Sequence, residues 1–329
     1  MTEPTHPLKP LCKKAFVTGG AGFIGSHLVD HLLAGRAEVV IYDNFTTGRP
    51  EFMPSPAPSG FQVIRGDVLD APALQKAMAG CDFVFHFQAN ADVREGKQKT
   101  RVDLEQNTLA TWNVLEAMRV NEIKNIAFAS SGAVYGEPEV FPTPESHAPL
   151  QTSLYGASKL AGEAMIQAYS EYFGIHSFSY RFVSWIGERY THGIVFDVMK
   201  KLLADSRRLP LLGDGTQKKS YLYVKDGVAG VMLGIKNAVA QKNVYNLGHD
   251  EFIDVVRVVS IILDELKLRD VKLEFAGGKR GWPGDSPLVH LDTTQIKSLG
   301  WRPSVSIEEG LRRTVRYLQQ RPHLLQGRK

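Results

Sequence analysis

The stretch Ala15–Gly25, with the sequence AFVTGGAGFIG, decides the fold of this chain. Its apolar first half predicts a β-strand, and the glycines that follow predict a tight turn. Behind the turn, Ile24, Leu28 and Leu32 recur at helical spacing. A strand, a glycine turn and a helix in this order are typical of a loop that holds a pyrophosphate at a helix N-terminus. The candidate contacts in this stretch are Gly19, Gly22, Phe23, Ile24 and Gly25.

A second apolar run, Val39–Tyr42, ends at Asp43. This is about where a dinucleotide fold carries the carboxylate that hydrogen-bonds the ribose. The two signals together predict dinucleotide binding, against the alternative that residues 19–25 form an ordinary strand-to-helix turn. Because a carboxylate repels a 2′-phosphate, Asp43 predicts NAD rather than NADP, although Arg49 lies nearby in the sequence.

Strands and helices continue to alternate along the chain. Apolar runs predict strands at Phe61–Arg65, Phe83–Phe87 and Asn125–Ser130, and apolar spacing predicts a helix from about Asp103 to Arg119. This alternation predicts an α/β fold with a Rossmann-type, doubly wound parallel sheet. Ligands of such a sheet lie beyond the carboxyl ends of its strands. Just after the first of these strands, Asp67 either accepts from an adenine amino group or is a turn residue.

Two more predicted strands, His176–Arg181 and Val244–Leu247, extend the sheet past the middle of the chain. From Ser184 onward the pattern loosens into loops, which favours a second, smaller unit interleaved with the first. The expected units are an NAD-binding domain at 12–182 to which 226–250 return, a smaller α/β substrate-binding domain at 183–225 and 251–318, and a flexible basic tail at 319–329.

The composition excludes several classes of protein. Of the 329 residues 43% are hydrophobic, and 39 basic residues stand against 35 acidic ones, for a net charge of +4. Anion binding is therefore expected to be local, which favours a phosphate-bearing small molecule over nucleic acid. Cys12 and Cys81 are too few for a disulfide framework and suit a reducing compartment. Met1–Pro10 lacks the apolar core of a signal peptide, and no apolar run approaches the ~18 residues of a membrane span, so we expect a cytoplasmic protein.

The segment Tyr155–Lys159, YGASK, carries the clearest catalytic potential. A spacing of four places the phenol and the ammonium on one face of a helix, about one turn apart. A free tyrosine, with a pKa near ~10, is a poor base at neutral pH. We expect the Lys159 cation, together with the positive nicotinamide of an oxidised cofactor, to lower the pKa of Tyr155. Such a pair alone is common on helix surfaces. Here it follows a nucleotide loop and Ser131, whose hydroxyl is placed to bridge a substrate and Tyr155.

Several motifs together resemble those of the extended short-chain dehydrogenase/reductases that act on nucleotide sugars. The motifs are the glycine loop, Asp43–Asn44, the segment Ser130–Gly136 (SSGAVYG) and YGASK at residues 155–159. The resemblance covers most of the chain, and the later matching segments are Leu212–Thr216, Tyr221–Val224 and Leu299–Trp301. Within this family the chain is most similar to the UDP-glucose 4-epimerase-like branch.

This resemblance implies a bound NAD, a homodimer, a nucleotide-diphosphate sugar as substrate, and a catalytic set of Ser131, Tyr155 and Lys159. In the implied reaction, Tyr155 takes the proton of the sugar 4-hydroxyl while a hydride leaves carbon 4 for the nicotinamide. The resulting 4-keto sugar turns its other face, and the hydride returns to give the epimer. The resemblance also implies that Lys159 holds the nicotinamide ribose and that Asn107 is a structural asparagine behind the site, although Asn107 is equally compatible with a helix surface.

The cofactor contacts follow from the same resemblance. Gln88 stands where the family generally has a small residue beside the cofactor, so it either adds a hydrogen bond on the nicotinamide side or crowds it. In addition to the glycine stretch, the expected contacts are Asp43, Asn44, Thr47, Gly48, Asp67, Val68, Gln88, Ala89, Asn107, Tyr155 and Lys159.

The substrate diphosphate needs cations or amides. Lys219 stands where the resemblance usually places an arginine, and Arg280 is the second candidate, each weighed against a solvated surface cation. Ser184 replaces an asparagine that commonly contacts the substrate. The expected substrate contacts are Arg94, Ser131, Ser184, His192, Lys219 and Arg280.

Alternative functions remain open at this point. The dehydratase branch of the family needs an added acid and base directly after the catalytic hydroxyl, and Gly132–Ala133 can supply neither, which disfavours 4,6-dehydration. A nucleotide-sugar 4-oxidoreductase, or another epimerase acting on a GDP- or CDP-sugar, uses the same residues. A non-catalytic NAD-binding sensor has no need of Tyr155 with Lys159. His27 and His31 have zinc-binding spacing but lack the glutamate of a metalloprotease motif, so no metal site is expected.

Overall fold

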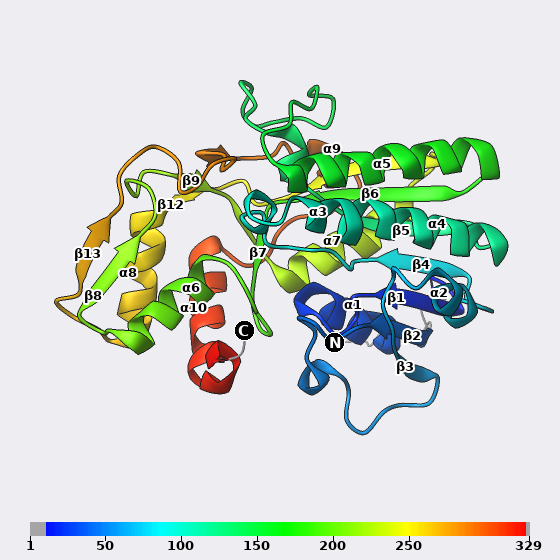
Figure 1. The fold of residues 1–329 in the computed structure, drawn as a ribbon, viewed down its shortest axis with the longest axis horizontal. Coiled ribbons are helices and arrows are strands. Elements are labelled where there is room, and N and C mark those ends of the chain that lie inside the picture. Colours follow the sequence, from blue (N-terminus) through cyan, green and yellow to red (C-terminus); the bar gives the residue numbers. More distant parts are fainter. Residues whose placement is uncertain (1–10, 327–329) are drawn as a thin grey trace, which may run out of the picture.

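A computed structural model describes residues 11–326. Met1–Pro10, in which we expect no signal peptide, and the last three residues of the expected tail lie outside the described residues. Within the described part, the main sheet has seven parallel strands in the order β11-β6-β5-β4-β1-β2-β3 (Figure 1). The strands are β1 (Lys14–Thr18), β2 (Glu38–Asp43), β3 (Phe61–Arg65), β4 (Phe83–His86), β5 (Asn125–Ser131), β6 (His176–Phe182) and β11 (Lys242–Leu247).

Helices cover both faces of this sheet. Because successive side chains of a strand point to opposite faces, Val17 packs with Leu28 and Val231 in one core while Phe16 packs with Ile166 in the other. This double layer confirms the predicted doubly wound α/β fold. The helices packed on the sheet are α1 (Phe23–Ala34) and α7 (Val224–Asn237) on one face, and α2 (Ala71–Ala77), α4 (Ala110–Val120) and α5 (Leu154–Phe173) on the other.

The helix predicted from about Asp103 to Arg119 is interrupted. It begins as α3 (Thr100–Asp103), widens into a π-helical turn at Leu104–Leu109, and continues as α4. We call residues 104–109 the π turn. Sequence spacing did not reveal the change, because Leu104 and Leu109 fit a helical apolar pattern in the sequence although both are exposed in the structure.

A smaller α/β part continues from the carboxyl edge of the main sheet (Figure 1). Its two longest helices, α8 and α10, pack through Ile261, Ile262, Leu311 and Val315. Its strands are β7 (Ser184–Ile186), β8 (Arg208–Leu211), β9 (Lys218–Lys219), β10 (Tyr221–Tyr223), β12 (Ile253–Asp254), β13 (Lys272–Phe275) and β14 (Leu288–Val289). Its helices are α6 (Ile194–Ala204), α8 (Val255–Leu266), α9 (Thr294–Ser298) and α10 (Ile307–Gln319).

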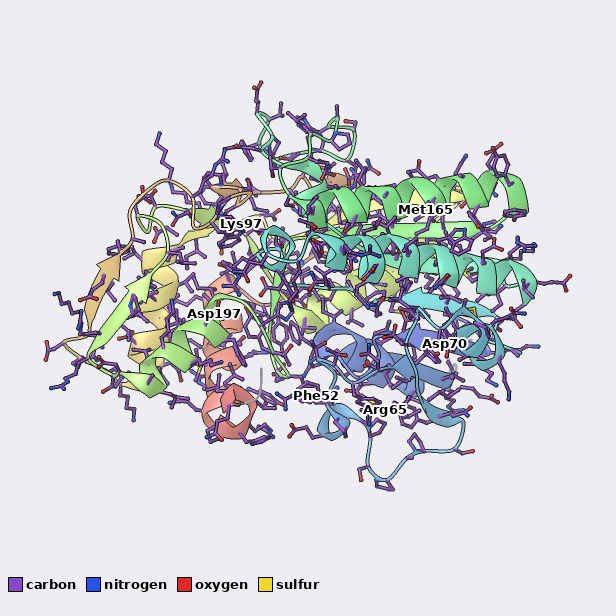
Figure 2. All side chains as sticks on the ribbon, in the orientation of Figure 1. Phe52, Arg65, Asp70, Lys97, Met165 and Asp197 are labelled. Atoms are coloured by element: carbon purple, nitrogen blue, oxygen red, sulfur yellow. The ribbon has the colours of Figure 1, made fainter. Side chains whose placement is uncertain are left out.

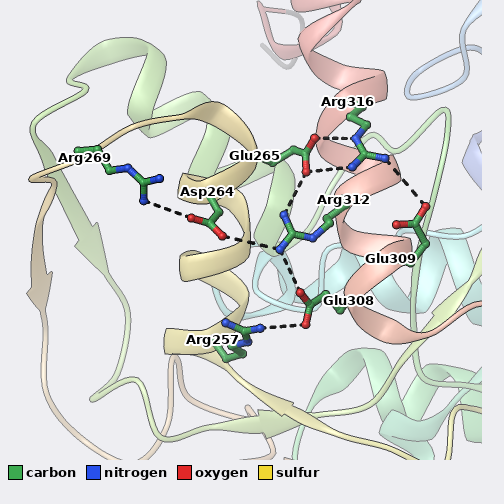
Figure 3. A network of polar contacts seen from close by, with 8 residues as sticks. All are labelled: Arg257, Asp264, Glu265, Arg269, Glu308, Glu309, Arg312 and Arg316. Atoms are coloured by element: carbon green, nitrogen blue, oxygen red, sulfur yellow. Dashed lines mark hydrogen bonds and ion pairs between the residues drawn. The ribbon is translucent and has the colours of Figure 1, made fainter.

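A network of ion pairs borders the α8–α10 seam (Figure 3). Arg312 of α10 contacts Glu265 of α8 at 3.2 Å and Glu308 of its own helix at 3.0 Å. Arg316 contacts the same Glu265 at 2.6 Å. The charged side chains therefore link the two helices around their apolar contact.

The expectation of a flexible tail from residue 319 is wrong for its described part. Residues Pro322–Gln326 form a 3₁₀ helix, and Leu324 and Leu325 are only 1% and 2% exposed. His323 also contacts Glu51 at 2.7 Å. The basic composition suggested a solvated segment, but burial of two adjacent leucines holds it against the core.

Among the helices of residues 11–326, none has the length and apolar character needed to cross a membrane.

Candidate active site

The glycine loop forms a cradle between β1 and α1. Gly19 has a φ of +72°, and a Cβ placed on it would lie 2.8 Å from the backbone of Gln88. A Cβ on Gly25 would lie 2.1 Å from the carbonyl oxygen of Gly19, so helix and strand can approach only without side chains here. Gly22 closes the turn, its N–H donating to the Gly19 carbonyl at 3.1 Å. The cradle leaves backbone amides at the start of α1, as a bound pyrophosphate requires.

Asp43 lies at the end of β2, beside this cradle. One carboxylate oxygen accepts the Ala21 N–H at 3.0 Å, and the other accepts the Phe45 N–H at 2.8 Å. Burial nevertheless raises the pKa of this carboxyl above its ordinary value. A Cβ on Gly48 would lie 2.8 Å from Asp43, so the glycine makes room for the carboxylate. The acid is therefore held where a dinucleotide ribose lies in this type of fold.

The residues expected around the adenosine also cluster. Asn44 donates through its Nδ2 to Asp67 at 3.1 Å, and Asp67 accepts the Leu69 N–H at 3.0 Å. Val68 is buried, and its carbonyl accepts from Asn113 Nδ2 at 2.9 Å. These contacts join the ends of β2 and β3 into one surface next to the cradle.

Ser131, Tyr155 and Lys159 come together at the end of β5. Ser131 caps a short 3₁₀ turn, its Oγ accepting the Ala133 N–H at 3.1 Å, and its hydroxyl lies close enough to the phenol of Tyr155 to favour the ionised form of that phenol. Lys159 is 3% exposed, donates to the carbonyl of Ala129 at 2.8 Å, and lies 5.9 Å from the centre of the Tyr155 ring. Ser153 starts helix α5 by capping it, accepting the Gly156 N–H at 3.0 Å, which places the phenol on the first turn.

The electrostatics of this pair differ from the sequence expectation. Burial raises the pKa of Tyr155 to about 12, and the nearby Ser131 hydroxyl, which favours phenolate, does not offset it. The charge of Asp103 raises the same pKa further. Burial also lowers the pKa of Lys159 to about 7, against the opposing charges of Asp103 and Glu163. Desolvation is therefore the largest cause at both groups, and the protein alone does not lower the pKa of its phenol.

Asn107 connects the π turn to α5. Its Nδ2 donates to Ser158 Oγ at 2.9 Å and to Asp103 at 3.2 Å, while its Oδ1 accepts the Asn90 N–H at 2.8 Å. Ser158 Oγ in turn donates to the carbonyl of Tyr155 at 2.7 Å. The side chain of Asn107 is thus used within the protein, which agrees with a structural role and not with a helix-surface position.

Gln88 does not direct its amide nitrogen toward the glycine cradle. Its Nε2 donates to the backbone carbonyl of Gln106 at 3.1 Å and to Gln106 Oε1 at 3.0 Å. Only the backbone of Gln88, followed by Ala89, borders Gly19. The long side chain is therefore accommodated against the π turn.

The three cations expected at the substrate each have acidic partners. Lys219 contacts Asp285 at 2.5 Å, and Arg280 pairs with Glu137. Arg94 pairs with Asp92 and with Asp197 of α6, which Figure 2 labels, both at 3.0 Å. An indole connects two of these cations, since Lys219 lies 4.9 Å and Arg94 6.0 Å from the ring centre of Trp282. A diphosphate at this position must share or replace these carboxylates.

The two remaining candidates lie on the segment after β6. Ser184 begins β7 and is exposed. His192 stacks on Tyr190 at 6.1 Å between ring centres, and Tyr190 meets Phe23 of α1 edge to face at 5.4 Å. His192 is thereby placed near the start of α1.

Sequence reasoning missed a buried ion pair next to the site. Glu163 is 1% exposed and accepts from Arg181 Nη2 at 2.7 Å and from the hydroxyl of Ser130. Glu163 follows Lys159 by four residues, so the same helical spacing that singled out Tyr155 and Lys159 also places this carboxylate on their face. Asp103, 1% exposed beside Asn107, was missed as well and carries no local sequence signal.

Within residues 11–326 no three His, Cys, Asp or Glu side chains are grouped to hold a metal ion. The glycine cradle, the carboxylate at the end of the second strand and the Ser-Tyr-Lys set together define a dinucleotide-dependent enzyme with a Rossmann-type fold. The chain belongs to the NAD dependent epimerase/dehydratase family, whose model matches residues 15–248. NAD is therefore its cofactor, and the tight glycine turn between β1 and α1 together with the Asp43 carboxylate fits that group.

Similar proteins span nearly the whole chain. A putative UDP-glucose 4-epimerase of Methanocaldococcus jannaschii is 32% identical over 92% of this chain and 97% of its own length. A crystal structure of UDP-galactose 4-epimerase is 34% identical, with a TM-score of 0.83, and covers 93% of this chain and 99% of its own. The dTDP-glucose 4,6-dehydratase DesIV from Streptomyces venezuelae, with NAD bound, is 28% identical, with a TM-score of 0.87, and covers 94% of this chain and 98% of its own.

Proposed function

We propose that this chain is an NAD-dependent nucleotide-sugar 4-epimerase that acts on a UDP-hexose. The observation that carries the proposal is the contact of Ser131 with Tyr155, one helical turn before Lys159 and at the same sheet edge as the glycine cradle. The names of the similar epimerases support the same reaction.

Each residue has a defined task in this reaction. Bound NAD supplies the acceptor and donor of the hydride at sugar carbon 4. Tyr155 removes the proton of the 4-hydroxyl and returns it after the 4-keto sugar has exposed its other face. Ser131 holds the phenol, and Lys159 adds positive charge on the same helix face. Because the pKa of Tyr155 is about 12 in the protein alone, its role as a base depends on the positive charge of the oxidised nicotinamide.

The similarity to a dehydratase raises a competing reaction, which this chain is poorly equipped to perform. Dehydration across carbons 5 and 6 needs a further acid and base, and Gly132 and Ala133 directly follow Ser131. Neither residue has a side chain that transfers protons. We therefore favour epimerisation over 4,6-dehydration.

We propose that Lys219 and Arg280 bind the substrate diphosphate, and that Asp285 and Glu137 occupy these cations until it arrives. Arg94, Ser184 and His192 are proposed to reach the sugar or the nucleotide. The experiment below compares UDP-sugars with the alternative GDP- and CDP-sugars and so identifies the nucleobase of the substrate.

We also propose a homodimer and a cytoplasmic location. The dimer is supported by apolar side chains exposed along α4 and α5, where Trp112 is 46% and Tyr172 79% exposed. The location is supported by Cys12 and Cys81, both of which are free thiols.

The decisive experiment incubates the purified protein, without added cofactor, with UDP-, GDP- and CDP-sugars and follows epimer formation by NMR. We expect a UDP-hexose to interconvert with its 4-epimer. Tyr155→Phe is expected to lose about 10²–10⁴-fold in rate while NAD remains bound, because only the proton-transferring hydroxyl is removed. Accumulation of NADH with an oxidised sugar would identify an oxidoreductase instead, and near-normal turnover of Tyr155→Phe would exclude this phenol as the base.

A further inference from the structure

A buried chain of hydrogen bonds joins the end of β4 to the π turn. Thr111 Oγ1 donates to the carbonyl of Asn107 at 2.6 Å and contacts His86 Nε2 at 3.1 Å. His86 Nδ1 lies 2.8 Å from Thr18 Oγ1, which accepts the Gln88 N–H at 3.3 Å. This series of hydrogen bonds therefore starts at Gln88, beside the glycine cradle, and ends at the backbone carbonyl of Asn107, next to helix α5.

The direction of every bond in this chain is determined. The single hydroxyl hydrogen of Thr111 goes to the Asn107 carbonyl, so Thr111 must accept from His86. His86 consequently carries its proton on Nε2, and its Nδ1 accepts from the hydroxyl of Thr18. His86 is 1% exposed, and burial lowers its pKa to about 3. The imidazole therefore stays neutral, and the direction of each hydrogen bond in this series does not change near neutral pH.

Gln88 makes a second attachment to the same turn. Its amide nitrogen must face Gln106, because the backbone carbonyl of Gln106 can only accept. Gln88 Oε1 then points elsewhere, and it is buried without a hydrogen-bond partner in the part of the chain that the structure describes. An unpaired buried amide oxygen costs stability, so its presence beside the π turn requires an explanation.

We propose that His86, acting through Thr111, and Gln88 are positioning residues of the epimerase site: they hold two successive carbonyl groups of the π turn, those of Asn107 and Gln106. The proposal rests on the proposed function. The held turn directs the amide of Asn107 to Ser158, and Ser158 bonds the carbonyl of Tyr155. The position of the Tyr155 backbone is thereby fixed by two side chains: His86, at the end of β4, and Gln88, just after it.

If either attachment is removed, we expect the phenol of Tyr155 to lose its alignment with the substrate. An error of about 1 Å in the placement of a reacting group costs up to about a hundredfold in rate. The side-chain amide nitrogen of Gln88 faces Gln106, and only the backbone of Gln88 borders the cradle, so removing the amide leaves the proposed NAD contacts of the cradle and of Asp43 in place. The expected signature is a fall in kcat with KM and NAD affinity retained.

Two variants remove one attachment each. Thr111→Val keeps the shape of the side chain and removes its hydroxyl, while Thr111→Ser keeps the hydroxyl and is the matched control. Gln88→Met keeps the length and removes the amide, and Gln75→Met makes the same change on an exposed side chain of α2. Three quantities are measured on the full chain: hydrogen exchange of the amides of residues 104–111, kcat with KM, and NAD binding by calorimetry.

We expect Thr111→Val and Gln88→Met to exchange at least about tenfold faster in residues 104–111 and to lose about tenfold in kcat, with KM and the NAD dissociation constant within about twofold. Thr111→Ser and Gln75→Met should behave as the unmodified chain. Unchanged exchange in both test variants overturns the proposal, and so does a loss of NAD affinity that parallels kcat. If the unmodified protein epimerises no nucleotide sugar, the proposed function fails, while the exchange comparison still decides whether these side chains hold the turn.

Discussion

Tyr155 and Lys159 illustrate how strongly a residue's surroundings modify its chemistry. Lys159 is buried and Tyr155 is partly buried, and this desolvation raises the pKa of the phenol to about 12 and lowers that of the ammonium to about 7. Each shift disfavours the charged form that catalysis needs. A ligand that brings positive charge to the phenol is therefore required before Tyr155 can accept a proton near neutral pH.

His86 gives a prediction at the same scale. Its pKa is lowered to about 3 in the folded chain, whereas an unfolded histidine titrates near ~6.5. Below about pH 6.5 the unfolded state binds a proton that the folded state does not, so stability that is present at neutral pH is lost on acidification. The loss approaches about 1.4 kcal/mol per pH unit below about pH 6. Urea unfolding at pH 7, 6 and 5 measures it.

The control for this prediction is His86→Gln, in which the buried titrating group is absent. His27 and His31 also have pKa values lowered by burial, so part of the acid sensitivity will remain in the variant. The pH dependence of the free energy of unfolding should nevertheless be shallower than in the unmodified chain. An identical dependence in the two proteins would show that His86 does not contribute.

At the scale of elements, the helix pair α8 and α10 combines an apolar seam with the ion pairs of Figure 3. Arg312 keeps about a quarter of its side chain exposed, and exposed pairs contribute only about 0–1 kcal/mol even with good geometry. Leu311 is 0% exposed in the seam. The apolar contact should therefore dominate the stability of this helix pair.

This difference can be measured by chemical unfolding of two neighbouring variants of α10. We expect Leu311→Ala to lower the free energy of unfolding by about 2–5 kcal/mol, because it removes buried methyl groups and leaves a cavity. Arg312→Met should cost at most about 1 kcal/mol, with an effect that shrinks as salt is added. A larger loss for Arg312→Met than for Leu311→Ala would mean that the charged network, and not the seam, holds the helices.

At the scale of the whole molecule, the helices on the second face of the sheet leave apolar side chains uncovered. Leu109 and Trp112 on the π turn and α4, and Tyr172 on α5, are 43%, 46% and 79% exposed. Large exposed apolar patches usually mark contact surfaces. The same helices are packed inward through Val114 and Ile166, so their outer faces are available to a second copy of the chain.

The dimer proposal predicts the effect of a charge on this surface. Trp112→Glu should shift the protein from dimer to monomer, because a buried unpaired carboxylate is costly at an apolar interface. Light scattering coupled to size exclusion measures the mass directly. Val239→Glu is the matched control, since Val239 is fully exposed in the loop after α7. A monomeric unmodified protein, or a dimer that tolerates Trp112→Glu, would contradict the proposed interface.

Much of the fold and the centre of the candidate site could be predicted from the sequence. The glycine stretch, the strand ending in Asp43 and the pair Tyr155 and Lys159 carry their signals within a few neighbouring residues, because turns and helical spacing are local properties. The family assignment, the parallel sheet and NAD follow from these signals and are confirmed. The role of each site residue stays a prediction.

Other features could not be predicted because they depend on segments far apart in the chain. The burial of Leu325 needs the core of the smaller part, and the pairing of Glu163 with Arg181 needs a helix and a strand to meet. The sequence by itself determined the alternation of strands and helices, the nucleotide cradle and the spacing of the proposed base and its lysine. Only the tertiary structure decided how far burial shifts their pKa values and which side chains hold the π turn, because desolvation and hydrogen-bond partners arise only when distant segments pack together.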